Sequence, residues 1–265
     1  MFARSKLGSI EQLASLKGKN VVITGAASGI GEAIAYRFGE AGASLSLIDI
    51  DQKGLTELQT TLMERNAEST IHRIDLRNKN EIDAFWDETQ ADILVNNAGI
   101  YPIRDFLELD PDFYDDVLKV NLNQVLWMCQ HFIKKNLKKG GVILNVSSIE
   151  AILPFKGGMS HYSISKMGVL ALTRGLARDY GKKGFRVNSL VPGGIITPGT
   201  KNVAKGIAKL NFGLIKTGYD FSTRLPLCRA GDPDEVALAA LFLVSDMSSY
   251  ITGAIIPVDG GFLSS

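Results

Sequence analysis

Short, nearly continuous apolar runs alternate along the chain with longer segments of helical periodicity. The apolar runs predict buried strands at 19–24, 44–49, 70–74, 92–95, 141–146, 186–191 and 254–258. Between them, apolar residues recur at intervals of three and four, which predicts helices at 55–66, 79–89, 111–138, 163–180 and 233–245. Buried strands that alternate with helices are typical of a parallel sheet covered on both faces. We therefore predict an α/β fold with a doubly wound parallel sheet of about seven strands.

The composition is that of an ordinary globular protein, with 265 residues of which 45% are hydrophobic and 22% are charged. A formal net charge of +1 provides no electrostatic basis for nucleic acid or a membrane surface as a partner. No apolar run approaches the ~18–20 residues that would span a bilayer, and the N-terminus lacks the apolar core of a secretory signal. We therefore expect a cytoplasmic protein.

No linker, repeat or low-complexity segment divides the chain, so residues 1–265 are expected to form one domain. Residues 198–228 are expected to cover the substrate as a lid, although an ordinary packed helix pair would give the same pattern. Cys129 and Cys228 lie among apolar neighbours and are expected to be buried, inert thiols. The three histidines lack the spacing of metal ligands, so no metal site is expected.

A glycine-rich turn follows the first predicted strand and opens a helix. Its spacing is Gly25-x-x-x-Gly29-x-Gly31, with Ser28 and Ile30 in the remaining positions before and after Gly29. Glycines in such a turn let backbone N–H groups approach a pyrophosphate, which the helix N-terminus also favours electrostatically. A simple tight turn is the alternative, but the strand–turn–helix context favours binding of a nucleotide.

Acidic residues follow the next two strands. A carboxylate at Asp49, 18 residues beyond Gly31, can accept hydrogen bonds from an adenosine ribose and would repel a 2′-phosphate. The first basic residue after it is Lys53, so NAD(H) is expected over NADP(H). Asp51 is better placed than Asp49 to cap the following helix. Asp75, followed by Leu76, can accept a hydrogen bond from the adenine amino group, or it can cap the next helix.

Asparagines mark the fourth strand and the long helix after it. In Asn96-Asn97-Ala98-Gly99 the amides can tie strand ends together, and the small Ala98 and Gly99 let a flat ring lie close to the backbone. Asn121 lies inside the predicted helix 111–138, where Asn is unfavourable by propensity. We therefore expect a local kink or a positioned amide at Asn121.

Tyr162 and Lys166 are four residues apart and therefore share one face of a predicted helix, about one turn from each other. A nearby ammonium favours phenolate, so Lys166 is expected to lower the pKa of Tyr162 and make it a useful proton donor and acceptor. A pair on a solvated helix surface is the alternative for this motif taken alone.

Together these motifs resemble the short-chain dehydrogenase/reductase family, in its compact form of roughly 250 residues. The resemblance extends over residues 19–261 and rests on Thr24–Gly31, Asp49, Asp75-Leu76, Asn96–Gly99, Asn121, Asn145–Ser148, Tyr162–Lys166, Pro192-Gly193 with Thr197, and Pro257–Gly261. It implies a Rossmann-type fold and an NAD(P)-dependent oxidoreductase that acts on CH–OH groups.

The resemblance also implies a catalytic tetrad of Asn121, Ser148, Tyr162 and Lys166. Ser148 would bind the substrate oxygen, and Tyr162 would give or take the proton. Lys166 would lower the Tyr162 pKa and bind the nicotinamide ribose, while Asn121 would hold a water that links Lys166 to solvent. Ser147 is a fallback for Ser148. The nicotinamide would lie against Pro192, Gly193, Ile195 and Thr197.

The substrate is expected to be a hydrophobic or 3-oxoacyl-type ketone or secondary alcohol, with a sugar, polyol or steroid as the alternative. The expected pocket residues are Ser148, Tyr162, Glu150, Leu153 and His161, although a solvent-facing role is favoured for Glu150. Helices 110–137 and 163–180, with Trp127 and Met128, are expected to pair into a homodimer or homotetramer. A catalytically silent nucleotide-binding regulator is the competing class.

Overall fold

The computed structural model describes residues 8–197 and 223–265, and the predicted lid therefore lies mostly outside the described residues. Seven strands form one parallel sheet in the order β3-β2-β1-β4-β5-β6-β7. The strands are β1 (Asn20–Thr24), β2 (Ser44–Asp49), β3 (Ser69–Arg73), β4 (Ile93–Asn96), β5 (Gly141–Val146), β6 (Phe185–Pro192) and β7 (Ile255–Val258). This confirms the predicted α/β class and the seven strands.

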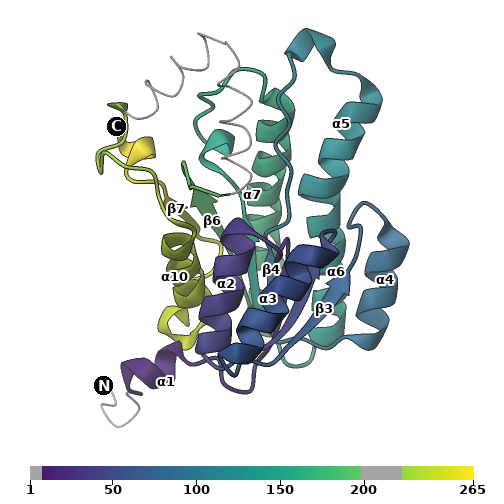
Figure 1. Ribbon diagram of the computed structural model, residues 1–265, viewed down its shortest axis with the longest axis vertical. Helices are drawn as coiled ribbons and strands as arrows, with labels where there is room; N and C mark the ends of the chain where they lie inside the picture. The colour runs from purple at the N-terminus through teal and green to yellow at the C-terminus, as the bar shows by residue number, and fades with distance from the viewer. Residues whose placement is uncertain (1–7, 198–222) are drawn as a thin grey trace.

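The helices cover both faces of this sheet (Figure 1). They are α1 (Ile10–Ala14), α2 (Gly29–Glu40), α3 (Gln52–Glu64), α4 (Lys79–Glu88), α5 (Pro111–Leu118), α6 (Gln124–Asn136), α7 (Ser160–Tyr180) and α10 (Pro233–Val244). Asp51 caps α3 through the backbone N–H groups of Lys53 and Gly54, as predicted. The short helix α1 was not predicted.

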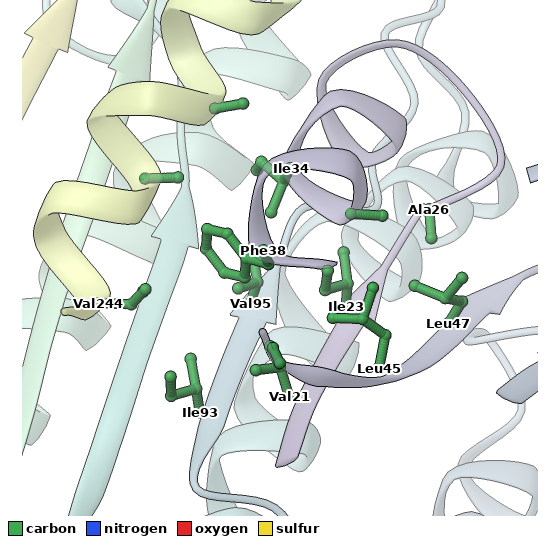
Figure 2. Packing of buried hydrophobic residues seen from close by; sticks show 14 of the residues in the cluster. Val21, Ile23, Ala26, Ile34, Phe38, Leu45, Leu47, Ile93, Val95 and Val244 are labelled. Carbon is green, nitrogen blue, oxygen red and sulfur yellow. The ribbon is translucent and has the colours of Figure 1, made fainter. Parts of the chain in front are cut away.

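Alternate strand residues belong to two separate cores because successive side chains point to opposite faces of a sheet. Val21 and Ile23 pack with α2, α3 and α10, where Ile34 and Phe38 are fully buried (Figure 2). Val22, between them, belongs to the opposite core with side chains of α4, α6 and α7. The continuous apolar strands of the sequence therefore reflect burial on both sides.

The long helix predicted at 111–138 is interrupted. A π-helical turn, Lys119–Asn123, separates α5 from α6, and Asn121 lies within it. A π turn inside an α-helix displaces the backbone and is frequent at functional sites. Asn121, where we expected a kink or a positioned amide, therefore lies at a local departure from α-helical geometry.

Three smaller predictions have mixed outcomes. Cys129 is buried, and burial raises the pKa of its thiol to about 12. Cys228 is exposed, so the expectation of a buried thiol is wrong there. The reason is that its backbone adopts the left-handed conformation (φ 53°) in a turn after Leu225, which directs the residue away from the core. Among the described residues, no helix is long and apolar enough to cross a membrane.

The strand order reverses beside β1, whose neighbours are β2 on one side and β4 on the other. In open parallel sheets, ligands bind outside the carboxyl ends of the strands at such a switch point. The segments after β1, β2, β3 and β4 therefore meet where a ligand is expected.

Candidate active site

A cleft of about 430 Å³ lies over the carboxyl ends of β1 to β4. Eleven of the predicted cofactor residues line it, namely Gly25, Ser28, Gly29, Ile30, Asp49, Asp75, Leu76, Asn97, Ala98, Gly99 and Thr197. These residues lie at or after the ends of five strands, β1 to β4 and β6, and they meet at one edge of the sheet because all the strands run in the same direction. The N-terminus of α2 and the Asp49 carboxylate both lie at this cleft, and these are features that a dinucleotide requires.

The glycine turn needs its glycines for two physical reasons. Gly25 has a φ of +65°, and a Cβ there would lie 2.7 Å from the Cα of Ala98. A side chain at Gly25 would therefore be strained and would also collide with the loop after β4. Gly31 does not line the cleft; it is buried against the backbone of Gly25, so its role is close packing of α2 beneath the turn.

Asp49 is held at the end of β2 by two backbone donors. The N–H of Ala27 donates to Oδ2 and the N–H of Asp51 donates to Oδ1, each at 3.0 Å. These contacts fix the carboxylate in the cleft while its remaining lone pairs stay available to a ribose. The next residue, Ile50, is 51% exposed and lines the same cleft.

Asp75 also lines the cleft, but it is engaged by a neighbour. The guanidinium of Arg77 donates to both of its carboxylate oxygens, with distances from 2.7 to 3.1 Å. The hydrogen bonds from Arg77 lower the Asp75 pKa. The alternative role of Asp75 as a helix cap is not observed, because Asn78 caps α4.

The asparagines after β4 join strand ends, as predicted. The Asn97 amide donates to the carbonyl oxygens of Thr24 and Gly25, and the Asn96 amide donates to Asn145 Oδ1 at 2.8 Å. Asn121 is clamped to Ile100, accepting from its N–H and donating to its carbonyl oxygen, both at 2.8 Å. Its side chain therefore anchors the loop that follows Gly99.

Tyr162 and Lys166 lie one turn apart on α7, with the Lys166 ammonium 5.9 Å from the centre of the Tyr162 ring. Burial raises the pKa of Tyr162 to about 12, and Glu150 and Tyr101 also raise it, while a hydrogen bond with Ser148 lowers it. Burial lowers the pKa of Lys166 to about 8. The predicted lowering of the Tyr162 pKa is therefore wrong, because desolvation of the phenolate by burial outweighs the opposing effects on its pKa.

The hydroxyl groups of Ser147 and Ser148 lie in different environments. The Ser147 hydroxyl is buried and donates to the carbonyl oxygen of Lys166 at 2.8 Å. Ser148 is partly exposed, and its hydroxyl interacts with Tyr162 and accepts from the N–H of Glu150 at 3.3 Å. Ser148, rather than the fallback Ser147, lies beside Tyr162.

Similarity to known proteins identifies the family. A family model described as enoyl-(acyl carrier protein) reductase matches residues 25–263. The 3beta-hydroxysteroid dehydrogenase 2 of Eggerthella lenta is 35% identical over 258 residues, which cover 93% of this chain and 95% of that protein. The chain belongs to the short-chain dehydrogenase/reductase family. It is an oxidoreductase that transfers hydride between a nicotinamide dinucleotide and a secondary alcohol or ketone.

Two solved structures of short-chain dehydrogenases/reductases show the same fold with different cofactors. A putative 2-deoxy-d-gluconate 3-dehydrogenase from Agrobacterium tumefaciens with bound NADP is 31% identical, with a TM-score of 0.86 and coverage of 96% of this chain and 99% of that chain. A 7 alpha-hydroxysteroid dehydrogenase complexed with NADH and 7-oxo glycochenodeoxycholic acid is 30% identical, also with a TM-score of 0.86, and the match covers 96% and 98% of the two chains. Structural similarity in this family therefore does not choose between the two dinucleotides.

Of the four residues predicted to lie against the nicotinamide in this short-chain dehydrogenase/reductase, only some line the cleft. Thr197 lines the cleft, whereas Ile195 is 6% exposed and packs at a second cavity beside Leu225. Pro192 ends β6, and the N–H of the next residue, Gly193, donates to the carbonyl oxygen of Val258. A Cβ at Gly193 would lie 2.8 Å from the Cα of Asp259. The close packing of the two backbones therefore requires a glycine at this position.

The substrate-side predictions need two corrections. His161 is fully buried, with its Nε2 bound to the carbonyl oxygen of Pro102 and its ring 5.1 Å from that of Phe113, so it offers no surface to a substrate. Glu150 does not face solvent, being only 5% exposed. Leu153 is partly buried beside a small apolar cluster that includes Leu225 and Phe262.

Sequence reasoning missed Tyr101. Its ring meets that of Tyr162 edge-on at 6.5 Å, and its hydroxyl hydrogen-bonds with Thr197. Tyr101 also lines the cleft together with Ile50, Ile74, Arg77, Ile100 and Val120. The only available signal was its position directly after the Asn96–Gly99 motif, where a side chain lies beyond the end of β4.

Proposed function

We propose that this chain is an NAD(H)-dependent oxidoreductase in which Tyr162 exchanges a proton with a hydrophobic ketone or secondary alcohol. The observation that supports it best is the convergence of Tyr162, Ser148 and Lys166 at the end of β5, beside the cleft that contains the glycine turn. A bound nicotinamide dinucleotide supplies or accepts the hydride.

The chain's own residues carry the proton chemistry. In the reducing direction, Tyr162 Oη donates its proton to the carbonyl oxygen while the carbonyl carbon receives the hydride, which gives the alcohol and a phenolate. Ser148 donates a hydrogen bond to the same oxygen and stabilises the charge that develops there. The Lys166 ammonium favours the phenolate, and a positively charged cofactor ring adds to that effect. Alcohol oxidation reverses these steps.

Asn121 supports this chemistry through the backbone. Its side chain is fully engaged with Ile100 and with Ser165 Oγ at 3.2 Å. We therefore assign the expected water relay to the main chain of the π turn, whose altered hydrogen-bond pattern can leave a carbonyl oxygen available for a water. Asn121 is then a positioning residue that keeps this turn and the Ile100 loop together.

NAD(H) is preferred over NADP(H) in this proposal because of the charges around Asp49. A carboxylate fixed by two backbone donors would oppose a 2′-phosphate, and Ile50 offers no positive charge beside it. Among the described residues that line the cleft, Arg77 is the cation, and its guanidinium is already paired with Asp75 and lies 3.4 Å from Asp116. The NADP-bound relative shows that the family admits the opposite choice.

The substrate class follows from the apolar character of the nearby cluster. Leu153 and Phe155 pack beside Ile149, Leu225 and Phe262, which suits a hydrophobic substrate such as a 3-oxoacyl compound. A hydroxysteroid is the second candidate, supported by the 35% identical relative from Eggerthella lenta. Sugars and polyols require more polar partners than this cluster provides.

We also propose a homodimer or homotetramer built on α6 and α7. Ile164 and Met167 on α7 are 51% and 48% exposed, and Leu126 on α6 is 38% exposed. Met128 does not contribute, because it is buried against the Trp86 indole N–H. Gel filtration that shows only a species of 28.7 kDa would contradict this assembly.

Absorbance of NADH tests the proposal. A panel of oxoacyl thioesters, steroids, polyols and simple alcohols is assayed with NAD⁺/NADH and with NADP⁺/NADPH. We expect turnover that falls by roughly 10²–10⁴-fold in Tyr162→Phe, with NADH binding by fluorescence nearly unchanged. Cofactor binding without turnover on any substrate would instead favour a silent regulator, and full activity in Tyr162→Phe would remove Tyr162 from the mechanism.

A further inference from the structure

Glu150 is a buried acid that the proposed chemistry does not use. It lies in the short helical turn Ile149–Ala151, directly after the end of β5, and is 5% exposed. Its Oε2 accepts a long hydrogen bond from the N–H of Phe155 at 3.3 Å, and the backbone N–H of Lys156 also hydrogen-bonds with the carboxylate. Its Oε1 has no hydrogen-bond partner among the residues that the structure describes. A buried carboxylate oxygen without a partner is costly, which calls for an explanation.

The position of Glu150 connects it to the proton-transfer group. Its backbone N–H donates to Ser148 Oγ, and Ser148 interacts in turn with the Tyr162 hydroxyl. Glu150 also interacts electrostatically with Tyr162 and raises the Tyr162 pKa. Glu150 is buried and Tyr162 is partly buried, which weakens solvent screening between them, so a negative charge on Glu150 opposes formation of a second negative charge on Tyr162.

We infer that the buried carboxylate of Glu150 is a positioning residue that retains the proton on Tyr162, so that carbonyl reduction persists to higher pH. This inference rests on the proposed role of Tyr162 as the proton donor. Glu150 makes no bond to the substrate in this account; it acts on the phenol through space.

Other charged and titratable groups face the same pair from several elements. The Lys166 ammonium lies 5.9 Å from the centre of the Tyr162 ring, and a positive charge there opposes the effect of Glu150. Tyr101, from the loop after β4, acts in the same direction as Glu150. Lys156 faces Glu150 from the loop before α7 and partly compensates its charge. Burial raises the Glu150 pKa above its ordinary value, and the inference concerns the ionised carboxylate.

Glu150→Gln tests the inference because the amide keeps an acceptor for the Phe155 N–H and removes only the charge. We expect the alkaline limb of kcat/KM for carbonyl reduction to move to lower pH by about one unit, a tenfold change in proton affinity. The acid limb for alcohol oxidation should move in the same direction. Glu64→Gln is the matched control, since Glu64 is exposed on α3 and its substitution changes the net charge equally. The pH profiles of the Glu64→Gln variant should coincide with those of the wild type.

A spectroscopic titration gives a readout without turnover. Tyrosinate absorbance of the cofactor-free protein, with the Tyr162→Phe spectrum subtracted, should appear at lower pH in Glu150→Gln than in the wild type. The inference would be overturned if the limbs of the pH profiles and the pH at which tyrosinate absorbance appears stay at their wild-type values or move to higher pH. If the Gln variant does not fold, Glu150→Met removes the same charge, and a shift of the same sign is required. Full activity in Tyr162→Phe would instead overturn the proposed function itself.

Discussion

The ammonium of Lys166 donates a hydrogen bond to the carbonyl oxygen of Val146 at 2.9 Å, at the last residue of β5. Lys166 is 3% exposed, and this carbonyl partly compensates a buried positive charge. The side chain is therefore held at the sheet edge where Tyr162 and the cleft residues converge, but at a cost in stability. Such costs are frequent at active sites, where function requires groups that packing alone would not select.

Lys166→Met is expected to stabilise the fold while it abolishes catalysis. Burial lowers the Lys166 pKa from 10.5 to about 8, so at pH 7 the folded protein holds a cation that would be better solvated after unfolding. We expect the free energy of unfolding at pH 7 to rise by roughly 1–3 kcal/mol in the variant. Wild-type stability should increase between pH 8 and about 10.5, as the folded protein releases this proton, and the variant should lack that increase.

Denaturant unfolding at pH 7 and at pH 10 measures both effects, and steady-state kinetics measure the catalytic loss. A variant that is less stable than the wild type at pH 7 would show that the hydrogen bond to Val146 outweighs the cost of burying the charge.

The two serines after β5 should separate stability from catalysis. Ser148→Ala removes the hydroxyl beside Tyr162 and is expected to lower kcat by roughly 10²–10³-fold, with little loss of stability. Ser147→Ala removes a buried hydrogen bond to the Lys166 carbonyl and is expected to cost about 1 kcal/mol of stability. Its kcat should fall far less than that of Ser148→Ala. Thermal melting and kinetics on the pair test the assignment, which fails if Ser147→Ala is the catalytically impaired variant.

The sequence predicted the sheet better than it predicted the electrostatics of the site. Strands that are buried on both faces leave continuous apolar runs, and Asn121 signalled the π turn because it is a poor residue inside a helix. The pKa of Tyr162 was misjudged because burial depends on segments that are distant in sequence, whereas the four-residue spacing to Lys166 is local. Tyr101 is a single aromatic residue without periodicity, so no pattern marked it.

His161 shows the same limitation from another direction. Its proximity to Tyr162 in sequence suggested a place in the substrate pocket. On a helix, however, adjacent residues point about 100° apart, and the side chain of His161 turns to Pro102 and Phe113, which lie some 50 residues earlier. Contacts between remote segments decide which face of α7 reaches the site.

Asn121→Ala should loosen the loop that carries Ile100 and Tyr101. The substitution leaves the N–H and the carbonyl oxygen of Ile100 without their side-chain partner, and we expect a loss of about 1–3 kcal/mol of stability. Because that loop lines the cleft, kcat/KM should also fall by at least about tenfold. Asn136→Ala is the control, since Asn136 is a buried amide at the far end of α6 that donates to Phe132. It should lose stability but retain the kinetics of the folded protein.

Comparing the kinetic losses of Asn121→Ala and Asn136→Ala distinguishes a specific effect on the site from a general loss of stability. Equal kinetic losses in both variants would indicate a general effect of helix destabilisation. A loss confined to Asn121→Ala would connect the π turn to the chemistry at Tyr162 and Lys166.

Asp49→Asn is expected to relax the choice of dinucleotide. The amide can still accept a hydrogen bond, but it no longer opposes a 2′-phosphate, and removing one charge repulsion at short range is worth roughly 1–2 kcal/mol. The ratio of kcat/KM for NADP⁺ to that for NAD⁺ should therefore rise by about five- to thirtyfold. Ile50→Arg, added to this variant, places a guanidinium beside the same position and should raise the ratio further.

Glu64→Gln, which changes the net charge equally on the exposed surface of α3, should leave the ratio unchanged. A wild-type protein that already prefers NADP⁺, or a ratio that Asp49→Asn does not move, would mean that the Asp49 carboxylate does not read the adenosine ribose.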